Sequence, residues 1–335
     1  MATCQGLMIA EQPYIGPPLL IFSEYATSPY VFYLSGSSYT KLANPGALPA
    51  TSTNVAIRSP NGRYVVVVSG AGTGAVRIYD LGSGAPIYIG GLVSPPIWGG
   101  INCVKFSPDS TKLLICDFSL SPYIWVYNVS NWTATTAPTP GKRALGCWSP
   151  DSTQIALIFY VSPWIVIYNA STGATASGQP ASLPSAEVDM VGWSPDGAHL
   201  AVATNMTTDK LWVYRTDTWA RISSPGTLPS GTPTGNNGGV VWSQDSSRLV
   251  VLTNSSPYIW SYTLSGQTLT YETSPVALPS GGANEIVFSP NGAKAFVAAA
   301  GATYLMTYVI PGWTRGTDAV TQPTAAATNL NCSIN

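Results

Sequence analysis

Charge is scarce in this sequence of 335 residues, which holds 14 lysines and arginines, 15 aspartates and glutamates and one histidine, His199. Charged residues make up 9% of the chain, against about 25% in an ordinary soluble domain. A nucleic-acid-binding surface needs clustered cations that neutralise phosphates, and these few scattered ones do not supply it. A single histidine also excludes a histidine-rich metal centre.

Long apolar runs are missing as well. No stretch approaches the roughly 20 consecutive apolar residues of a membrane-spanning helix, so we expect no membrane insertion. The first residues, Met1 to Gln5, have neither a basic start nor a long apolar segment, so we expect no signal peptide. Glycine (32 residues) and proline (28) are frequent, and both are unfavourable inside helices, so little helix is expected. The 45% apolar content argues against disorder.

A four-residue turn recurs along the chain, with intervals of 48, 42, 45, 49 and 46 residues between its serines. Proline presets the backbone, Asp or Asn hydrogen-bonds nearby backbone groups, and a final Gly accepts a positive φ. Segments rich in Val, Ile and aromatic residues flank each turn, which is typical of β-strands. The copies are Ser59–Gly62, Ser107–Ser110, Ser149–Ser152, Ser194–Gly197, Ser243–Ser246 and Ser289–Gly292.

Two further markers share this period. Leu-Pro pairs mark the connections, and Ser-Pro followed by Tyr or Trp opens four aromatic strands that end on a tyrosine, with three weaker copies that lack the Ser-Pro pair. We expect the tyrosine rings to pack inside while their hydroxyls find hydrogen-bond partners at the rim. These tyrosines, spaced 46, 48, 41, 46, 48 and 46 residues apart, are Tyr33, Tyr79, Tyr127, Tyr168, Tyr214, Tyr262 and Tyr308.

Three markers in one order within about 46 residues predict an all-β fold, a seven-bladed β-propeller with four-stranded antiparallel blades. Seven aromatic strands face six turns, and Asn329–Asn335 imitates the missing inner strand and turn. We therefore expect this C-terminal strand to complete the first blade, which continues through Leu19–Leu34, and to close the ring. Residues 1–16 would form an N-terminal arm and residues 17–335 a single propeller.

Four aromatic residues form a candidate interaction surface. They follow Ser-Pro pairs in the turns between second and third strands, which would share a face with the connections between blades. Rings on a rigid, nearly uncharged surface suit stacking on sugars or contact with a protein. Alternatively, the rings only cover the ends of the blades. The residues are Tyr30, Tyr123, Trp164 and Tyr258.

The sequence offers few residues that could form a catalytic site. The turn aspartates occur once per blade, which would keep them apart rather than pair them for general acid–base catalysis. No nucleophile motif accompanies His199, which we expect to be a half-exposed edge residue at the start of a strand. We therefore expect no enzymatic activity, no catalytic residue, no cofactor and no metal. The turn aspartates are Asp109, Asp151, Asp196 and Asp245.

The five cysteines lack Cys-x-x-Cys spacing, so small buried side chains are the expected role. Cys4 and Cys332 both fall at the blade that would close the ring, and a disulfide between them is a further hypothesis.

The repeat resembles the propeller repeats of tailed-bacteriophage and prophage proteins, over about residues 17 to 335. A looser similarity extends to the WD-repeat superfamily, whose Gly-His and Trp-Asp pairs are absent. Lactonase-like propellers share the turn, but this chain lacks their cluster of acidic and histidine ligands. The segments that match the phage repeats are Ser121–Tyr127, Ser256–Tyr262, Thr40–Leu42, Ala47–Pro49, Ala277–Pro279 and Ser194–Gly197.

The resemblance implies a non-enzymatic virion structural protein, made in the host cytoplasm. The expected role is a tail-associated or adhesion component that contacts other virion proteins or host-surface carbohydrate, with no nucleic-acid partner. A capsid decoration protein is the alternative, and a lactonase-like enzyme or a scaffold propeller is a further one. The low charge predicts association through shape, hydrogen bonds and aromatic contact, with weak dependence on salt.

Overall fold

The computed structural model contains strands and turns in the residues that it describes, and no helix. No described segment could therefore cross a membrane as a helix. The strands group into two compact units, Met1–Ala144 with Ser171–Gly173 and Thr328–Asn335, and Leu145–Ala170 with Ala174–Ala327. The described residues are 19–22, 30–35, 38–41, 53–69, 75–82, 86–93, 100–117, 121, 123–135, 138, 144–234, 239–275, 279, 282–289, 291–299, 305–316 and 331–332.

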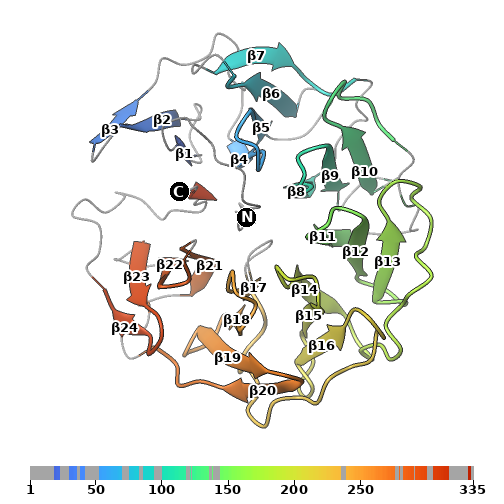
Figure 1. Ribbon diagram of the computed structural model, residues 1–335, viewed down its shortest axis with the longest axis vertical. Coiled ribbons are helices and arrows are strands. Elements are labelled where there is room, and N and C mark those ends of the chain that lie inside the picture. Colours follow the sequence, from blue (N-terminus) through green and yellow to red (C-terminus); the bar gives the residue numbers. More distant parts are fainter. Residues whose placement is uncertain are drawn as a thin grey trace. The chain divides into compact units, whose positions relative to one another are not determined.

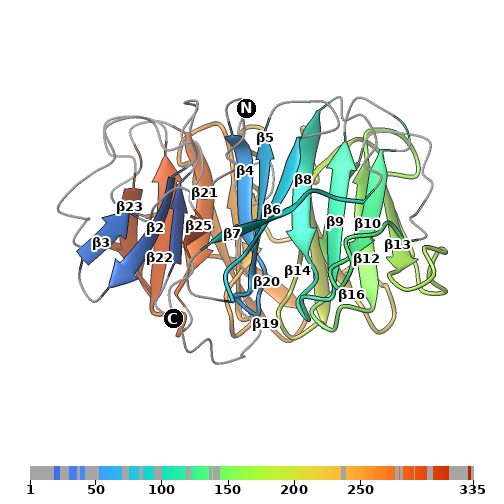
Figure 2. The same ribbon diagram turned by 90° about the horizontal axis from the view of Figure 1, so that it is seen from above.

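The first unit holds three sheets whose strands lie side by side in the orders β25-β1-β2-β3, β4-β5-β6-β7 and β8-β9-β10 (Figures 1 and 2). Strands β1, β4 and β8 contact one another in that order. The bounds are β25 Asn331–Cys332, β1 Leu19–Phe22, β2 Tyr30–Ser35, β3 Ser38–Lys41, β4 Thr53–Arg58, β5 Tyr64–Ser69, β6 Val76–Asp80, β7 Ile87–Gly90, β8 Ile101–Phe106, β9 Lys112–Asp117 and β10 Ile124–Asn128.

The second unit holds four sheets, in the orders β11-β12-β13, β14-β15-β16, β17-β18-β19-β20 and β21-β22-β23-β24. Contacts join β12 to β14, β14 to β17 and β18 to β21. The bounds are β11 Ala144–Trp148, β12 Gln154–Phe159, β13 Ile165–Asn169, β14 Val188–Trp193, β15 His199–Thr204, β16 Leu211–Arg215, β17 Val240–Trp242, β18 Arg248–Leu252, β19 Ile259–Ser265, β20 Thr268–Tyr271, β21 Ala283–Phe288, β22 Lys294–Ala299, β23 Leu305–Val309 and β24 Thr314–Arg315.

The two ends of the described chain meet in one sheet. Strand β25 pairs with β1 in antiparallel fashion, with Leu20 opposite Cys332 and Ile21 opposite Asn331. Strand β1 in turn pairs with β2. The C-terminal strand thus lies beside the N-terminal segment that the sequence associates with it.

Not every sheet has the four strands that the repeat predicts, and this expectation needs correction. Sheets β8–β10, β11–β13 and β14–β16 have three strands in the described residues. A single bridge stands where a fourth strand would pair: Tyr127 with Ala134, Tyr168 with Thr175, and Tyr214 with Arg221. The segments after these bridges are small, polar or proline-containing, as in Ala174–Gly178. Glycine or proline follows each bridge within four residues, at Pro138, Gly178 and Pro225, and both residue types disfavour a strand.

The repeated turns, five with Ser-Pro-Asx and one with Ser-Gln-Asp, are confirmed at all six positions. Each serine hydroxyl donates to the Oδ1 of the Asx residue at 2.5–2.8 Å. The same hydroxyl accepts the backbone N–H five residues later at 2.8–2.9 Å. Strand pairing then follows one register, since the sixth residue after the serine lies opposite the strand-ending tyrosine, as Val65 does Tyr79 and Leu249 does Tyr262.

Serine replaces the final glycine in three of these turns and still adopts a positive φ, at Ser110 (61°), Ser152 (63°) and Ser246 (58°). Two of these serines join neighbouring sheets. The Oγ of Ser110 accepts the N–H of Asn61 at 2.9 Å, and the Oγ of Ser246 accepts the N–H of Asp196 at 3.0 Å. The hydroxyl thus gives a link between turns that glycine could not provide.

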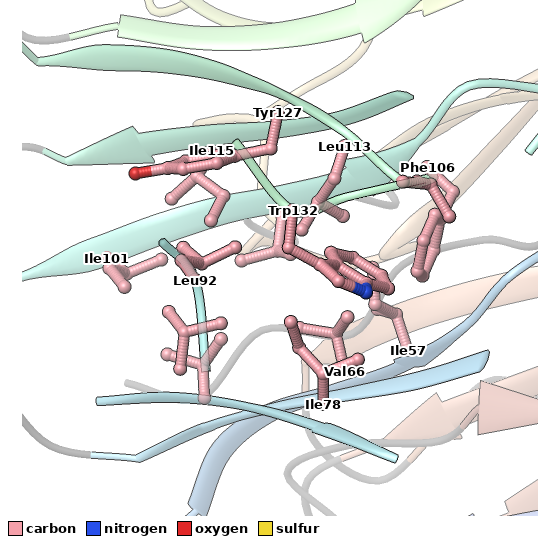
Figure 3. Close-up of a cluster of buried hydrophobic side chains, with 14 of the residues drawn as sticks. Ile57, Val66, Ile78, Leu92, Ile101, Phe106, Leu113, Ile115, Tyr127 and Trp132 are labelled. Atoms are coloured by element: carbon pink, nitrogen blue, oxygen red, sulfur yellow. The ribbon is translucent and has the colours of Figure 1, made fainter. Parts of the chain in front are cut away.

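The hydrophobic core lies between consecutive sheets. One cluster joins β4–β7 to β8–β10, another joins β14–β16 to β17–β20, and a third joins β17–β20 to β21–β24. Figure 3 shows the first cluster, with Trp132 among side chains from both sheets. The residue before the turn serine is buried at four of the six turns, as Phe106, Trp148, Trp193 and Trp242, and Phe288 is partly buried.

Three buried tryptophans that the repeat analysis missed complete this packing. Trp132, Trp219 and Trp313 lie in turns after third strands, with φ of 56°, 57° and 51°. Each ring meets the aromatic residue before a turn serine, with centroids 6.5 Å apart for Phe106, 5.8 Å for Trp193 and 6.4 Å for Phe288, respectively. The left-handed backbone conformation at these positions directs each tryptophan ring into the core.

Candidate functional site

The four predicted interaction residues stand at the start of third strands, as the sequence indicates. The carbonyl oxygens of Tyr123, Trp164 and Tyr258 accept the N–H of the last residue of the preceding strand or the residue after it, at 2.7–2.9 Å. Tyr123 and Tyr258 have positive φ, 23° and 63°. Tyr30 begins β2 opposite Phe22, and its side chain lies outside the described atoms.

These residues do not gather into one site within either unit. Tyr30 and Tyr123 belong to sheets that are separated by β4–β7, while Trp164 and Tyr258 belong to sheets that are separated by β14–β16. Each residue would therefore contact a partner separately, with one contact point on each of these sheets.

The described rings are partly covered. Tyr123, Trp164 and Tyr258 are half-buried, and Tyr258 packs against a hydrophobic cluster that includes Ile259 and Val250. A half-buried ring keeps one part in the core and offers another to a partner. This geometry accommodates both hypotheses from the sequence, since the rings cover strand ends and remain accessible.

The turn aspartates are engaged by their own turns. The Oδ1 of Asp151 takes the hydroxyl of Ser149 at 2.5 Å and the N–H of Thr153 at 3.0 Å. Burial raises the pKa of Asp151, but these hydrogen bonds outweigh burial and leave the pKa below its ordinary value. Asp245 has the same arrangement and a lowered pKa for the same reasons. Such carboxylates are structural acceptors for the backbone.

His199 begins β15 and is half-buried, as expected from the sequence, but β15 is the central strand of its sheet rather than an edge. Its ring stacks on Trp242 of the next sheet, with centroids 6.0 Å apart and an angle of 28°. Burial lowers the pKa of His199 and the nearby Arg215 lowers it further, against the opposing effect of Asp196. A neutral imidazole stacked on a buried indole serves packing between two sheets.

Asp189 is an ionisable residue that the repeat analysis missed. It is the extra residue of a bulge in β14, between the buried Val188 and Met190. Its Oδ2 is buried and has no hydrogen-bond partner among the described residues. Burial, together with the negative charge of Glu187, raises the pKa of Asp189 to about 7. The sequence signal was a carboxylate inside an otherwise apolar inner strand.

A second missed feature is a polar network around Glu272, just after β20. Its carboxylate accepts two hydrogen bonds from Arg248 at 2.8 Å and one each from Ser261 at 2.5 Å and the indole of Trp313 at 3.2 Å. Burial raises the pKa of Glu272, but the bonds from Arg248 and Ser261 outweigh burial and lower it. The network ties sheet β17–β20 to the turn that precedes β24.

The strand-ending tyrosines require a correction. The rings of Tyr79, Tyr127, Tyr214, Tyr262 and Tyr308 are buried as predicted, and Tyr168 is half-buried. The hydroxyls of Tyr127, Tyr214 and Tyr262 are buried without a hydrogen-bond partner in the described part of the chain. Burial raises the pKa of Tyr127 to about 12. These hydroxyls therefore end inside the packing rather than at its rim.

The described cysteines agree with the prediction of small buried side chains. Cys103, Cys116 and Cys147 are buried. Cys4 lies outside the described residues, and so does the N-terminal arm, so a Cys4–Cys332 disulfide stays a hypothesis. Within the residues that the structure describes, no group of three or more His, Cys, Asp or Glu side chains is arranged to hold a metal ion.

Comparison with known proteins connects the chain to others by structure. No protein-family model matches the chain, and no curated protein matches it in sequence. A crystal structure of a functionally unknown protein from Desulfotomaculum acetoxidans DSM 771 is similar, with a TM-score of 0.68 and 15% identity over 95% of this chain and 99% of that chain.

Two further solved structures are similar to it. A chain of the mitotic checkpoint complex matches with a TM-score of 0.64 and 17% identity, covering 90% of this chain and 91% of that chain. The β-propeller domain of Cps50 (Swd1) from Myceliophteria thermophila matches with a TM-score of 0.60 and 12% identity, covering 79% and 85%. At such identities the similarity concerns the fold alone, which is all-β and resembles a WD-repeat β-propeller.

Proposed function

We propose that the protein is a non-enzymatic structural component of a bacteriophage virion. Its role would be tail-associated or adhesive, in contact with other virion proteins or with a host-surface glycan. The observation that carries the proposal is the repeat itself, in which Ser-Pro-Tyr, Leu-Pro and Ser-Pro-Asx markers recur in one order over about residues 17 to 335. This combination resembles the propeller repeats of tailed-phage proteins.

The proposal includes a ring of seven blades in which β25 completes the blade of β1–β3. The pairing of Leu20 with Cys332 supports this closure, as does the presence of seven sheets in the described residues. A closed ring would leave no inner sheet edge open to other chains. Residues 17–335 would form the propeller and residues 1–16 an arm outside it.

The contact surface in this proposal includes Tyr30, Tyr123, Trp164 and Tyr258. Aromatic rings supply contact area at low entropic cost and stack well on sugars and on protein surfaces. Because 9% of residues are charged, association should depend little on long-range electrostatics. Attachment should therefore change little between low and moderate salt, and a steep loss would contradict this surface.

Purified particles test the proposal directly. We expect mass spectrometry to find the protein in stoichiometric amount in particles from the producing culture, and antibody labelling to locate it at the tail. Labelling over the whole head would instead support the alternative of a capsid decoration protein. A protein that stays in the cell lysate and never enters particles would overturn the virion role.

Cell binding then separates adhesion from attachment alone. An adhesive component should bind host cells and block infection, and Tyr123→Ala with Trp164→Ala should weaken that binding. A variant that lacks residues 2–12 tests the arm, since normal incorporation into particles would show that the arm is not the anchor. Val309→Ala, an exposed apolar residue far from the four rings in sequence, serves as the control.

A further inference from the structure

The outer strand of sheet β4–β7 carries an unusual concentration of exposed apolar side chains. Among the described residues, the large apolar side chains that are exposed are Ile87, Tyr88, Ile89, Val93, Leu183 and Val309. Four of these six lie within seven residues, and Ile87, Ile89 and Val93 are 53%, 45% and 49% exposed. Single exposed apolar residues are normal on proteins, whereas a cluster marks a binding surface.

A bulge explains why three successive side chains are exposed. Strand β7 pairs with β6 through Asp80 with Ile87, Tyr79 with Tyr88 and Ile78 with Gly90, so Ile89 is an extra residue. Successive side chains of a regular strand point to opposite faces, and an extra residue redirects the chain. Gly90 accommodates the bend with a φ of 122°.

Buried neighbours hold this segment in place. Leu92 is buried in the hydrophobic cluster between the two sheets, and the N–H of Val93 donates to the carbonyl of Trp132 at 2.9 Å. The ring of Tyr88 lies 5.6 Å from that of Tyr79 and 6.0 Å from the guanidinium of Arg77. The exposed side chains are therefore presented on a fixed segment and would lose little conformational freedom on binding.

The fourth strands of the second unit, β20 and β24, lack such a surface. Strand β20 buries Leu269 and exposes Thr268 and Thr270, and β24 consists of Thr314 and Arg315. Of the charged residues beside the apolar segment, Asp80 is bound by Arg63 at 3.1 Å and by the N–H of Gly82 at 2.7 Å, and Arg77 lies over the ring of Tyr88.

We propose that Ile87, Tyr88, Ile89 and Val93, named here the β7 patch, dock a short apolar and uncharged segment of another virion subunit. The proposal rests on the virion role proposed above. A stable interface between two folded proteins needs about 800 Å² and 20–30 residues on each side. Four side chains are far fewer, so the patch suits a short segment rather than a second copy. An uncharged segment fits because burial of an unpaired charge is unfavourable.

Photo-crosslinking in assembling particles tests this inference. The probe is p-benzoylphenylalanine in place of Tyr88, with the same probe in place of Val309 as the matched control, because Val309 is a lone exposed apolar residue. We expect illumination to join position 88, and not position 309, to one short segment of a different virion protein. In parallel, Ile89→Lys should lower incorporation into particles about tenfold while Val309→Lys leaves it within about twofold.

Each outcome decides between the claims. Incorporation without an adduct at position 88 overturns the patch and leaves the virion role intact, and an adduct with another copy of this chain overturns the short-segment occupant. Absence of the wild-type protein from particles overturns both proposals. If Ile89→Lys unfolds at a lower temperature than the wild type, the crosslinking result alone decides.

Discussion

Sheets β4–β7 and β17–β20 have the same arrangement of inner strands and differ in the outermost strand. In both, the Ser-Pro-Asx or Ser-Gln-Asp turn joins the first two strands, and the strand-ending tyrosine, Tyr79 or Tyr262, lies opposite the sixth residue after the turn serine. Both sheets contribute these inner strands to buried clusters. The shared plan thus covers the part of each sheet that packs on its neighbours.

The outermost strands of the two sheets differ in which side chains they expose. Strand β7 exposes Ile87, Tyr88 and Ile89, whereas β20 buries Leu269 and is followed by Glu272, which is bound by Arg248. Inner strands face neighbours on both sides and tolerate few changes, while an outer strand has fewer neighbours to satisfy. The difference teaches that specific roles in this repeat are to be sought on outer strands.

Loss of a core tryptophan should have the largest effect on stability, because it removes packing between the inner strands of neighbouring sheets. Trp132→Ala removes a buried ring that meets Tyr64 at 5.2 Å and Phe106 at 6.5 Å. We expect the free energy of unfolding to fall by about 3–5 kcal/mol, measured by urea denaturation. The control is Val93→Ala, because the side chain of Val93 is exposed and its backbone N–H donates to the carbonyl of Trp132. This substitution should lower the free energy of unfolding by less than about 0.5 kcal/mol. Equal losses would contradict this view of the core.

Asp189 sharpens the statement that inner strands tolerate few changes, since it places a carboxylate in one. Its pKa of about 7 lies above the ordinary 3.8, so its contribution to stability is full below pH 4 and is lost as the pH rises to about 7. Asp189→Asn should therefore stabilise the protein by about 2–4 kcal/mol at pH 8 and by little at pH 4. Thermal unfolding across this pH range measures the effect. The same gain at both pH values would rule out titration of Asp189 as its cause.

The polar closure of sheet β17–β20 is tested at Glu272. Glu272→Gln leaves the guanidinium of Arg248 half-buried without its charged partner, and we expect a loss of about 2 kcal/mol at neutral pH. Because the pKa of Glu272 is lowered from 4.5, its contribution is present above pH 4.5 and is lost as the pH falls through the lowered value. Wild type and variant should therefore converge in acid. Asp217→Asn, which removes an exposed ion pair with Arg215, is the control and should change stability little.

The smallest effects separate two tyrosines of the same sheet. Tyr262 has a buried hydroxyl without a partner in the described residues, whereas the hydroxyl of Tyr271 hydrogen-bonds Ser274 at 2.6 Å. Tyr262→Phe should leave stability unchanged or raise it by up to about 1 kcal/mol, while Tyr271→Phe should lower it by about 1 kcal/mol. Chemical denaturation of both variants gives the comparison. A loss at Tyr262 would mean that its hydroxyl is hydrogen-bonded in solution.

Much of the fold could be predicted because its signals are local and repeated. A Ser-Pro-Asp turn satisfies its own backbone within five residues, as at Ser107–Lys112, so it reads the same in any context. The alternation of Val, Ile and aromatic residues beside each turn likewise marks the strands. The fourth strands were overpredicted, because the pairing of an outer strand depends on marginal segments such as Ala174–Gly178.

The candidate site was harder to predict than the fold. The sequence placed Tyr123, Trp164 and Tyr258 correctly at the start of third strands. Within the two units, sheet β14–β16 separates Trp164 from Tyr258, and sheet β4–β7 separates Tyr123 from Tyr30. The β7 patch was missed because Ile-Tyr-Ile reads as an ordinary buried strand. Its exposure follows from a one-residue bulge in the pairing with β6.

The sequence by itself determined the period, the turns and the inner strands, since each depends on residues close together in the chain. Tertiary structure alone decided which polar groups are satisfied: Ser110 links two turns, Glu272 binds Arg248, and Asp189 stays without a partner in the described residues. These outcomes depend on contacts between residues up to about fifty positions apart. Only the packing of whole sheets brings such groups together or leaves one buried alone.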